Sequence, residues 1–351
     1  MSDPLKPKSA SGLDRRQVLS AAASLAATLG ISSTVSPALA ATKPKPKQLT
    51  GPFDSFRDYI NALDERGLLL RVQRVDEDQY ELAALTYRLI DEFGWYNAPA
   101  VLVEEIKQDG RWMKGPVLTN HQGHWDTEAI IFGKDPVPGD GPATYREVFN
   151  YLYGIIESGN GKLPQIPTTP VPRASAPVKE IVLRGDEINL LDFAFIKSNP
   201  GDSARYVNTG SVFTEDQDLG MNFGTYRCES KGPRHLGVNC EDGQTGWKMF
   251  MKKIERGEKT CPVSIVIGQD PISWLISSSL ISKGGADELA IAGGLRGRAV
   301  DVIKSETNDM LIPANAEMVI EGEVLLDQME PEGPFGEMYG YLGLKKEKNF
   351  V

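Results

Sequence analysis

The sequence predicts a mixed α+β protein with two folded parts. Up to about residue 157, segments with helical periodicity alternate with short apolar runs, as in an α/β or α+β domain. Beyond residue 177 the apolar runs are strand-like and turn residues separate them, which indicates a β-rich barrel or sandwich. Between the two parts, residues 162–177 contain five prolines and show no periodicity, so we expect a linker or an extended crossing segment there.

The first part is expected at residues 53–161. Its first helix begins after Asp54 or Ser55, which are good N-cap residues, and ends at Gly67, which suits a left-handed C-terminal position. The elements expected next are a strand at 68–72, a helix with Leu82, Leu85 and Leu89 on one face, a strand at 100–106, and a helix opened by a capping box at Thr144 and Glu147.

The second part is expected at residues 178–351. The predicted strands are 180–183, 211–214, 263–268, 299–303 and 317–326, and one helix is predicted near 286–292. The last three residues, 349–351, have the pattern of a strand that stops soon after it begins.

The N-terminus has the layout of a twin-arginine signal. Arg15 and Arg16 precede an apolar run at 18–31, and Ala38 and Ala40 form a small-residue cleavage pattern. The alternative is a chance arginine pair before an amphipathic helix. We expect residues 1–40 to direct export to the periplasm through the twin-arginine translocase, and residues 41–52 to form an exposed linker. Because that route carries folded proteins, we hypothesise that the mature chain holds a cofactor.

Composition argues against two other classes of protein. Across 351 residues the formal net charge is −10, whereas nonspecific nucleic-acid binding needs a basic surface. The three cysteines, Cys228, Cys240 and Cys261, are widely spaced and contain no Cys-x-x-Cys pair. An odd, dispersed set does not suggest a disulfide framework.

Asn222 and Arg227 form the first candidate constellation. Asn222 offers a neutral oxygen ligand, and Arg227 offers a planar fork for a carboxylate. On an extended strand their odd spacing would place them on opposite faces, so that one addresses a cofactor or metal and the other a substrate. The alternative is an asparagine in a turn and an arginine in a surface ion pair.

Residues 270–297 form the second constellation. The serines at 277–279 follow an apolar segment, and their hydroxyl and backbone N–H groups are able to hold phosphate. Glu288 lies just before an apolar run and is expected to point inward. The glycines match neither a dinucleotide fingerprint nor a P-loop, and a serine-rich surface loop is the alternative.

Residues 331–341 form the third constellation, with the sequence PEGPFGEMYGY. Its glycines and proline exclude a regular helix, and a bend would bring Glu332 and Glu337 together. Acid–base chemistry needs one carboxyl that holds a proton and another that a cation keeps ionised. The aromatic residues expected to wall such a site are Phe335, Tyr339 and Tyr341. A solvated Gly/Pro turn is the alternative.

Taken together, the three constellations resemble the UbiD family of decarboxylases, which use prenylated FMN. The shared features are an Asn-x-Gly-x-Tyr-Arg run at 222–227, serines followed by Asp-Glu and Gly-Gly-Leu-Arg-Gly within 277–297, and the 331–341 motif, which is nearly that of the family's ferulic acid decarboxylases. The segments 55–72 and 308–325 also match, so the resemblance covers about residues 53–351.

The resemblance implies an N-terminal α/β domain followed by a split β-barrel flavin-binding domain. It also implies nonoxidative, reversible decarboxylation of an aromatic or α,β-unsaturated acid with prenylated FMN, Mn²⁺ and potassium. The partners it implies are a small carboxylic acid, a flavin prenyltransferase and, for a full-length form, a second copy of the chain. Family chains continue further, so we expect an incomplete barrel here and no C-terminal α/β domain.

The resemblance assigns roles by position. Arg227 would orient the substrate carboxylate, Glu332 would pair with that arginine, and Glu337 would protonate the carbon after CO₂ leaves. Asn222 and Glu288 would bind the metal. The remaining positions implied to contact the cofactor, its phosphate or potassium are Phe223, Tyr226, Gln244, Ser278, Ser279 and Leu280.

One departure concerns the metal site. The family places a metal-binding histidine downstream of the arginine, but this sequence has Gln244 or Thr245 there, and His235 lies too early. Glu241, Asp242 or Gln244 are the substitutes we consider. Two further readings of the chain are therefore an exported flavin-binding protein without decarboxylase activity and a nonfunctional truncated homologue.

Overall fold

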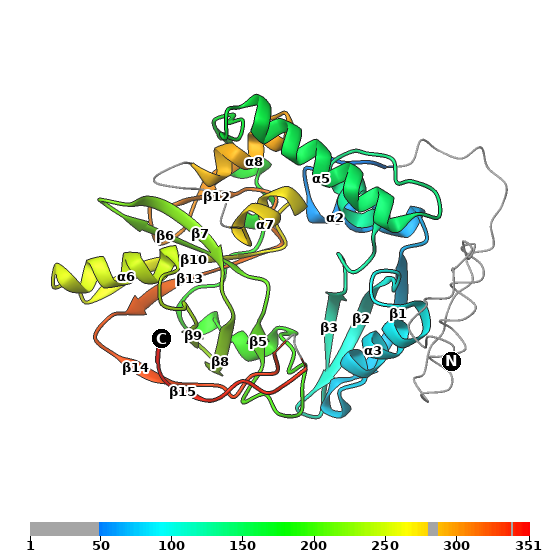
Figure 1. Cartoon of the computed structure of the whole chain (residues 1–351). Coiled ribbons are helices and arrows are strands. Elements are labelled where there is room, and N and C mark those ends of the chain that lie inside the picture. Colours follow the sequence, from blue (N-terminus) through cyan, green and yellow to red (C-terminus); the bar gives the residue numbers. More distant parts are fainter. Residues whose placement is uncertain (1–48, 280–286, 338–339) are drawn as a thin grey trace, which may run out of the picture.

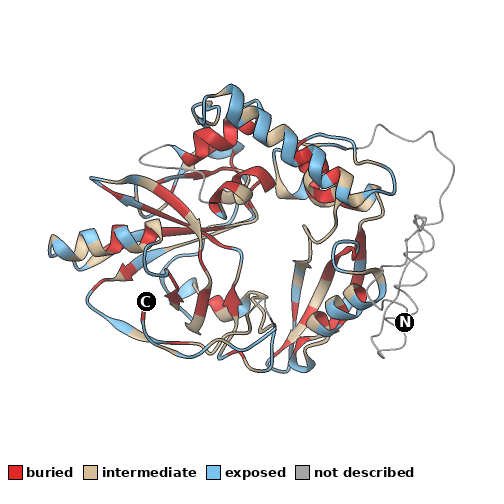
Figure 2. Cartoon of the chain, in the orientation of Figure 1, coloured by how far each residue is buried: buried red, intermediate tan, exposed pale blue. Residues whose placement is uncertain are grey.

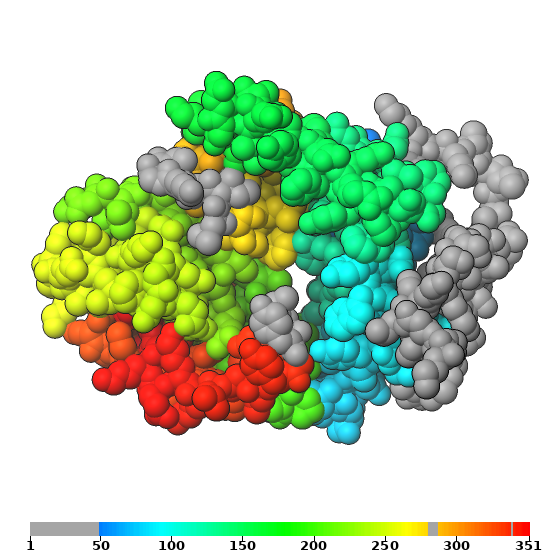
Figure 3. All heavy atoms as spheres, in the orientation of Figure 1, coloured from blue at the N-terminus to red at the C-terminus, as the bar shows by residue number. Residues whose placement is uncertain are grey.

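The computed structural model describes residues 49–279, 287–337 and 340–351, and the chain folds as a mixed α+β protein (Figure 1). The predicted signal at 1–40 lies outside the described residues. A small three-stranded sheet with its helices lies on one side, and three further sheets lie on the other. The space-filling view shows a narrow opening between these two parts (Figure 3).

The N-terminal part contains one sheet in the order β1-β2-β3. Strand β1 pairs with β2 in parallel, and β2 pairs with β3 antiparallel. The elements are α2 (Phe56–Glu65), β1 (Leu69–Asp76), η1 (Glu77–Gln79), α3 (Glu81–Phe93), β2 (Ala100–Gln108), β3 (Arg111–Thr119), α4 (Asp126–Ile131) and α5 (Gly141–Ser158).

The local rules account for most of this part. Ser55 caps α2 by accepting a hydrogen bond from Asp58 N, and Gly67 follows the helix with a φ of +72°. The leucines predicted for one face of α3 are all buried. The predicted capping box is wrong: Asp140 caps α5, and Thr144 lies inside the helix, where its hydroxyl bonds to Asp140 O.

The second part holds three sheets, in the orders β13-β10-β6-β7, β12-β11-β4 and β14-β15-β9-β8-β5. Its strands are β4 (Thr169–Pro170), β5 (Tyr206–Val207), β6 (Ser211–Asp216), β7 (Gly220–Thr225), β8 (Cys228–Gly232), β9 (His235–Val238), β10 (Thr260–Ile267), β11 (Asp301–Lys304), β12 (Leu311–Pro313), β13 (Met318–Leu325), β14 (Met329–Glu332) and β15 (Lys346–Phe350). Its helices are η2 (Arg173–Ser175), η3 (Pro177–Lys179), η4 (Gly185–Glu187), η5 (Leu190–Asp192), α6 (Thr245–Glu255), α7 (Pro271–Ser277) and α8 (Glu288–Arg296).

The proline-rich segment 162–177 is an extended crossing segment that is hydrogen-bonded to the second part. Ile166 N donates to Ala290 O on α8, and Thr169 N donates to Val300 O. Gly293 and Gly294 permit this close approach, because a Cβ at Gly294 would lie 2.0 Å from Pro164 O. The predicted strand at 180–183 is wrong, since that segment forms no ladder and Ile181 is exposed.

One hydrophobic core joins the two parts. It combines residues of α2, α4 and α5 with residues of β6, β7, α7 and α8, and Figure 2 shows buried positions on both sides. His121 of the N-terminal part packs edge-on against Trp274 of α7, with ring centroids 5.4 Å apart. Burial lowers the pKa of His121 to about 4, so the imidazole that packs against Trp274 is neutral near neutral pH. Among the described residues, no helix has the length and apolar character that crossing a membrane requires.

Candidate active site

Arg227 lies between the two glutamates of the 331–341 motif. Its Nε and Nη2 donate to the two carboxylate oxygens of Glu332 at 2.8 and 3.0 Å, and its Nη1 donates to Glu337 Oε1 at 3.0 Å. The side chain of Glu332 is 1% exposed, that of Arg227 is 20% exposed and that of Glu337 is 29% exposed. The bend brings Glu332 and Glu337 to the same guanidinium, and the catalytic roles that the resemblance implies for the three residues stay predictions.

The environment keeps the guanidinium charged. Burial alone would lower the pKa of Arg227, but the hydrogen bonds and charges of Glu332 and Glu337 raise it above the ordinary value. The guanidinium carbon also lies 4.5 Å from the centre of the Phe335 ring, which adds a cation–π contact. Arg227 is therefore a fixed cation that has one deeply buried partner and one more accessible partner.

The loop after β14 shapes this cluster. Glu332 ends the strand, and Gly333 follows with a φ of +79°, which starts the bend. Gly343 N donates to Phe335 O and Glu337 N donates to Tyr341 O, so residues 335–337 lie beside residues 341–343. Of the predicted aromatic wall, Phe335 is in place and Tyr339 lies outside the described residues. Tyr341 is 61% exposed, so its predicted role in a dry wall is wrong.

Asn222 and Glu288, the predicted metal ligands, lie on neighbouring elements. Glu288 Oε2 accepts a hydrogen bond from Phe223 N at 2.9 Å, which brings the carboxylate beside the position of Asn222. Asn222 is buried, and its Nδ2 has no hydrogen-bond partner among the described residues. Glu288 occupies the first turn of α8, where the helix dipole favours an ionised carboxylate. The hydrogen bond from Phe223 N also gives a partner to a backbone N–H group of β7, which is the edge strand of its sheet.

The other predicted cofactor positions in this region have structural partners. The Phe223 ring stacks on Phe213 at 4.7 Å between centroids, and its N–H is used by Glu288. Tyr226 is buried, its hydroxyl accepts from Gly246 N at 3.1 Å, and burial raises its pKa to about 12. Gln244 precedes α6, and its side-chain oxygen accepts from Glu241 N at 2.7 Å. Within the described part of the chain, no group of three His, Cys, Asp or Glu residues could hold a metal.

A cluster of hydroxyl groups lies where β7 meets the end of α7. Thr225 Oγ1 lies 2.8 Å from Ser277 Oγ and 3.0 Å from Ser278 Oγ. Ser277 also accepts from Ser211 at 2.7 Å, and the Ser279 hydroxyl donates back to Leu275 O. Leu280 lies outside the described residues. Ser277 and Ser278 thus adjoin Thr225, the last residue of β7, two positions before Arg227.

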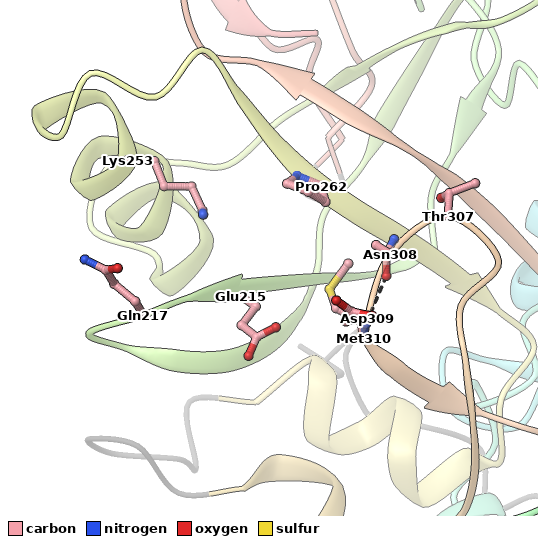
Figure 4. Close-up of a pocket in the computed structure, with 8 residues that line it drawn as sticks. All are labelled: Glu215, Gln217, Lys253, Pro262, Thr307, Asn308, Asp309 and Met310. Carbon is pink, nitrogen blue, oxygen red and sulfur yellow. Dashed lines mark hydrogen bonds between the residues drawn. The ribbon is translucent and has the colours of Figure 1, made fainter.

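A cavity of about 470 Å³ lies elsewhere, and no predicted site residue lines it (Figure 4). Glu215 from β6, Lys253 from α6 and Pro262 from β10 contribute to it together with residues 307–310. Two of its charges are already paired, Lys253 with Glu258 and Asp309 with Lys304. We assign no function to this cavity.

Comparison with known proteins identifies the family. Residues 169–351 match the UbiD family model, described as the 3-octaprenyl-4-hydroxybenzoate carboxy-lyase Rift-related domain. The chain belongs to the UbiD family. Among curated relatives, a phenolic acid decarboxylase of Sedimentibacter hydroxybenzoicus is 29% identical over 298 residues. An uncharacterised protein of Archaeoglobus fulgidus is 35% identical over 300 residues. Both alignments cover 82% of this UbiD-family chain and 58% of the relative, so the chain spans less than two thirds of their length.

Solved structures agree with this assignment. The vanillic acid decarboxylase of Sedimentibacter hydroxybenzoicus in open form, with a truncated second subunit, matches with a TM-score of 0.72 and 27% identity over 85% of this chain and 60% of that chain. An evolved dimeric form of the UbiD-class enzyme HmfF from Pelotomaculum thermopropionicum, in complex with prFMN, gives a TM-score of 0.71 at 27% identity over 85% of this chain and 64% of that one. The UbiD-class fold therefore extends over most of the chain.

Sequence reasoning missed several residues that shape the site. Phe335 was expected in an apolar wall. Its contact with the guanidinium of Arg227 was not expected, because the spacing of residues in the sequence does not indicate which side chains stack. Thr225 and Ser211 join the serines only through contacts between distant elements. Asp202, which binds the loop of Glu337, follows an Asn-Pro-Gly turn, and that turn was the one local signal available.

Proposed function

We propose that this protein catalyses the nonoxidative, reversible decarboxylation of an aromatic or α,β-unsaturated carboxylic acid with prenylated FMN. The observation that carries the proposal is the single guanidinium of Arg227 held by two carboxylates of unequal accessibility. Relatives with similar sequences are described as phenolic acid and vanillic acid decarboxylases, which supports an acid substrate of this class.

The surroundings of the three residues support the roles proposed for them. Glu332 is buried and bidentate, so it holds the guanidinium plane in one orientation. Arg227 keeps part of its surface exposed and can attract a substrate carboxylate. Glu337 makes one hydrogen bond to Arg227 and is the most exposed of the three side chains, which suits a group that delivers a proton to the carbon after CO₂ leaves.

The hydroxyl groups near Thr225 fit a phosphorylated cofactor, whereas Asn222 and Glu288 offer two of the several oxygen ligands that a hard cation takes. The oxygen of Asn222 and the carboxylate of Glu288 would contribute to a Mn²⁺ site, with potassium nearby, and the hydroxyls of Ser278 and Ser279 would contact the phosphate. When bound, prenylated FMN would supply an electron sink for the electron pair released on loss of CO₂. Arg227, Glu332 and Glu337 would hold the acid, exclude competing orientations and return a proton.

The test uses the chain produced together with a flavin prenyltransferase. CO₂ release is measured across a panel of aromatic and α,β-unsaturated acids. We expect turnover by the unaltered protein and a loss of about 10² to 10⁴-fold in Glu337→Gln, the range that one general acid contributes. Glu347→Gln, an exposed glutamate on β15, is the matched control and should keep full activity. Full activity in Glu337→Gln would exclude it as the proton donor.

A second candidate is flavin binding without decarboxylation. It is favoured by the finding that no three His, Cys, Asp or Glu residues of the described segments form a group that could hold a metal. Purified protein that carries a flavin spectrum yet releases no CO₂ across the same panel would support this candidate over the enzyme.

We also propose that the protein is exported to the periplasm by the twin-arginine translocase, on the basis of Arg15, Arg16 and the apolar run at 18–31. Cell fractionation of an Arg15→Lys, Arg16→Lys variant tests this, since cytoplasmic accumulation of the variant alone is expected.

A second copy of the chain is the proposed partner in assembly. Size-exclusion chromatography with light scattering would measure the molar mass of the assembly and so test this proposal.

A further inference from the structure

The loop that carries Glu337 is held in place by a second segment, residues 199–203. Asp202 is buried, and its Oδ1 accepts a hydrogen bond from Gly336 N at 2.6 Å. In the opposite direction, Ser203 N donates to Pro334 O at 2.9 Å. Two backbone groups that flank Phe335 are thus fixed from outside the loop, and Gly336 directly precedes Glu337.

Asp202 itself is rigidly placed. Its Oδ2 accepts from Asn199 N at 3.0 Å, and its own N–H donates to Asn199 O at 3.0 Å, which closes the turn at 199–202. The contact with the loop is close, because a Cβ on Gly336 would lie 3.0 Å from Cβ of Asn199. A larger residue at 336 would therefore require the Asn199 side chain to shift by a few tenths of an ångström.

A ring contact continues the same support. The Tyr206 ring packs edge-on against Phe335 with centroids 4.7 Å apart, and the Tyr206 hydroxyl lies 2.8 Å from Ser203 Oγ. Phe335 in turn lies under the guanidinium of Arg227. The segment 199–206 thereby contacts the loop at the backbone beside Glu337 and at the aromatic platform of Arg227.

We propose that Asp202 is a positioning residue for Glu337: it anchors the Gly336 amide so that the Glu337 carboxyl reaches Arg227 and the reacting carbon. This inference rests on the proposed function for its catalytic consequence, while the anchoring of the loop stands on geometry alone. In this role Asp202 contacts neither substrate nor cofactor. It acts through the backbone of the loop.

The test compares Asp202→Ala with Asp202→Asn in the full chain. Hydrogen exchange is followed by mass spectrometry for peptides that cover 333–343, and kcat and KM are measured on the protein produced with a flavin prenyltransferase. Asp202→Ala should speed exchange in this segment at least tenfold and lower kcat at least tenfold with little change in KM. Asp202→Asn keeps one oxygen acceptor for Gly336 N but turns its NH2 group toward Asn199 N, so it should restore only part of both. Asp186→Ala, a fully exposed aspartate, is the control and should change neither.

A second variant separates a local effect from global unfolding. Gly336→Ala changes the loop side of the same contact, because its Cβ would press against the Asn199 side chain. It should reproduce the local rise in exchange and the fall in kcat. The proposal is overturned if the hydrogen-exchange rate of the 333–343 peptides in Asp202→Ala or in Gly336→Ala equals that of the unaltered protein. It is also overturned if Gly336→Ala raises the exchange rate by the same factor in every peptide of the chain. If the unaltered protein shows no turnover, the proposed function fails while the exchange measurements still decide whether Asp202 anchors the loop.

Discussion

Glu332 is the carboxylate on which the orientation of Arg227 depends. Its side chain is almost completely buried, and both of its oxygens accept from the guanidinium. We predict that Glu332→Ala lowers the free energy of unfolding by about 3 kcal/mol, because removal of one partner leaves a largely buried cation with a single remaining carboxylate. Urea unfolding followed by circular dichroism measures this change.

Glu330, two residues earlier on the same strand, provides the comparison. Its side chain is 42% exposed and faces Lys231 at 3.7 Å and His235 at 3.5 Å. Glu330→Ala should cost less than about 1 kcal/mol, as solvent-exposed pairs do. Equal losses for the two variants would mean that the Arg227–Glu332 pair has no special weight in stability.

For single residues, the sequence predicted which charged groups meet better than it predicted which way each side chain points. The convergence of Glu332 and Glu337 followed from a bend that glycine and proline make necessary, so spacing was sufficient. Tyr341 looked equivalent to Phe335 in the same motif, yet it is exposed. The path of the loop at Pro334 and Gly336 depends on hydrogen bonds to residues 202 and 203, which lie more than a hundred positions away.

Helix α3 starts beside a buried carboxyl, that of Glu77. Its Oε2 accepts from Leu82 N at 3.1 Å, whereas its Oε1 has no hydrogen-bond partner among the described residues. Burial raises the pKa of Glu77 to about 7 from its ordinary value of 4.5. The folded state therefore holds a proton that the unfolded chain releases at lower pH.

The sign of the effect follows from linkage. Between pH 4.5 and 7 the native state binds more protons at Glu77 than the unfolded state does, so the contribution of this group to stability falls as the pH rises through that window. We predict that Glu77→Gln stabilises the protein at pH 8 by up to about 3 kcal/mol relative to its effect at pH 4.5. Thermal unfolding at both pH values tests this, and a pH-independent difference between the two proteins would contradict it.

Among elements, those with an amphipathic pattern or a strong apolar run were predictable. The burial of Leu82, Leu85 and Leu89 shows that periodicity alone placed α3. The predicted strand at 180–183 failed for a tertiary reason. The neighbouring Lys179 and Arg184 form ion pairs with Glu306, and this charged cluster holds the segment without any strand partner.

The two parts of the molecule are joined by charges as well as by the shared core. Arg296 of α8 donates to Asp54 at 2.6 Å and lies 3.4 Å from Asp270, and both Arg296 and Asp270 have side chains that are 3% exposed. Burial raises the pKa of Asp270, while Arg296 counters that effect. We predict that Arg296→Met destabilises the protein by about 3 kcal/mol, since it leaves Asp270 buried without a cation.

Arg298 is the matched control for this prediction. It also pairs with Asp54, at 2.7 Å, but its side chain is 44% exposed. Arg298→Met should cost less than about 1 kcal/mol in the same urea titration. If Arg296→Met and Arg298→Met lower the free energy of unfolding equally little, the hydrogen bonds that Asp270 accepts from Ser273 and the first turn of α7 are enough to stabilise its carboxylate. The contact between the two parts would then depend on apolar packing.

At the scale of the whole molecule, the sequence predicted two parts and a mixed α+β class but not the order of strands. Neighbours such as β15 and β9, or β11 and β4, are distant in sequence and pair through a few residues only. No local pattern encodes such pairings, because each depends on how the rest of the chain has already packed.

The shared guanidinium has a consequence for the charge balance of the site. One arginine faces two carboxylates, so the three groups carry one formal positive charge and two formal negative charges. An acid that enters as its anion would add to the negative excess. Binding of the acid at this cluster must therefore come from short-range contacts with Arg227 and not from the net charge of the three groups.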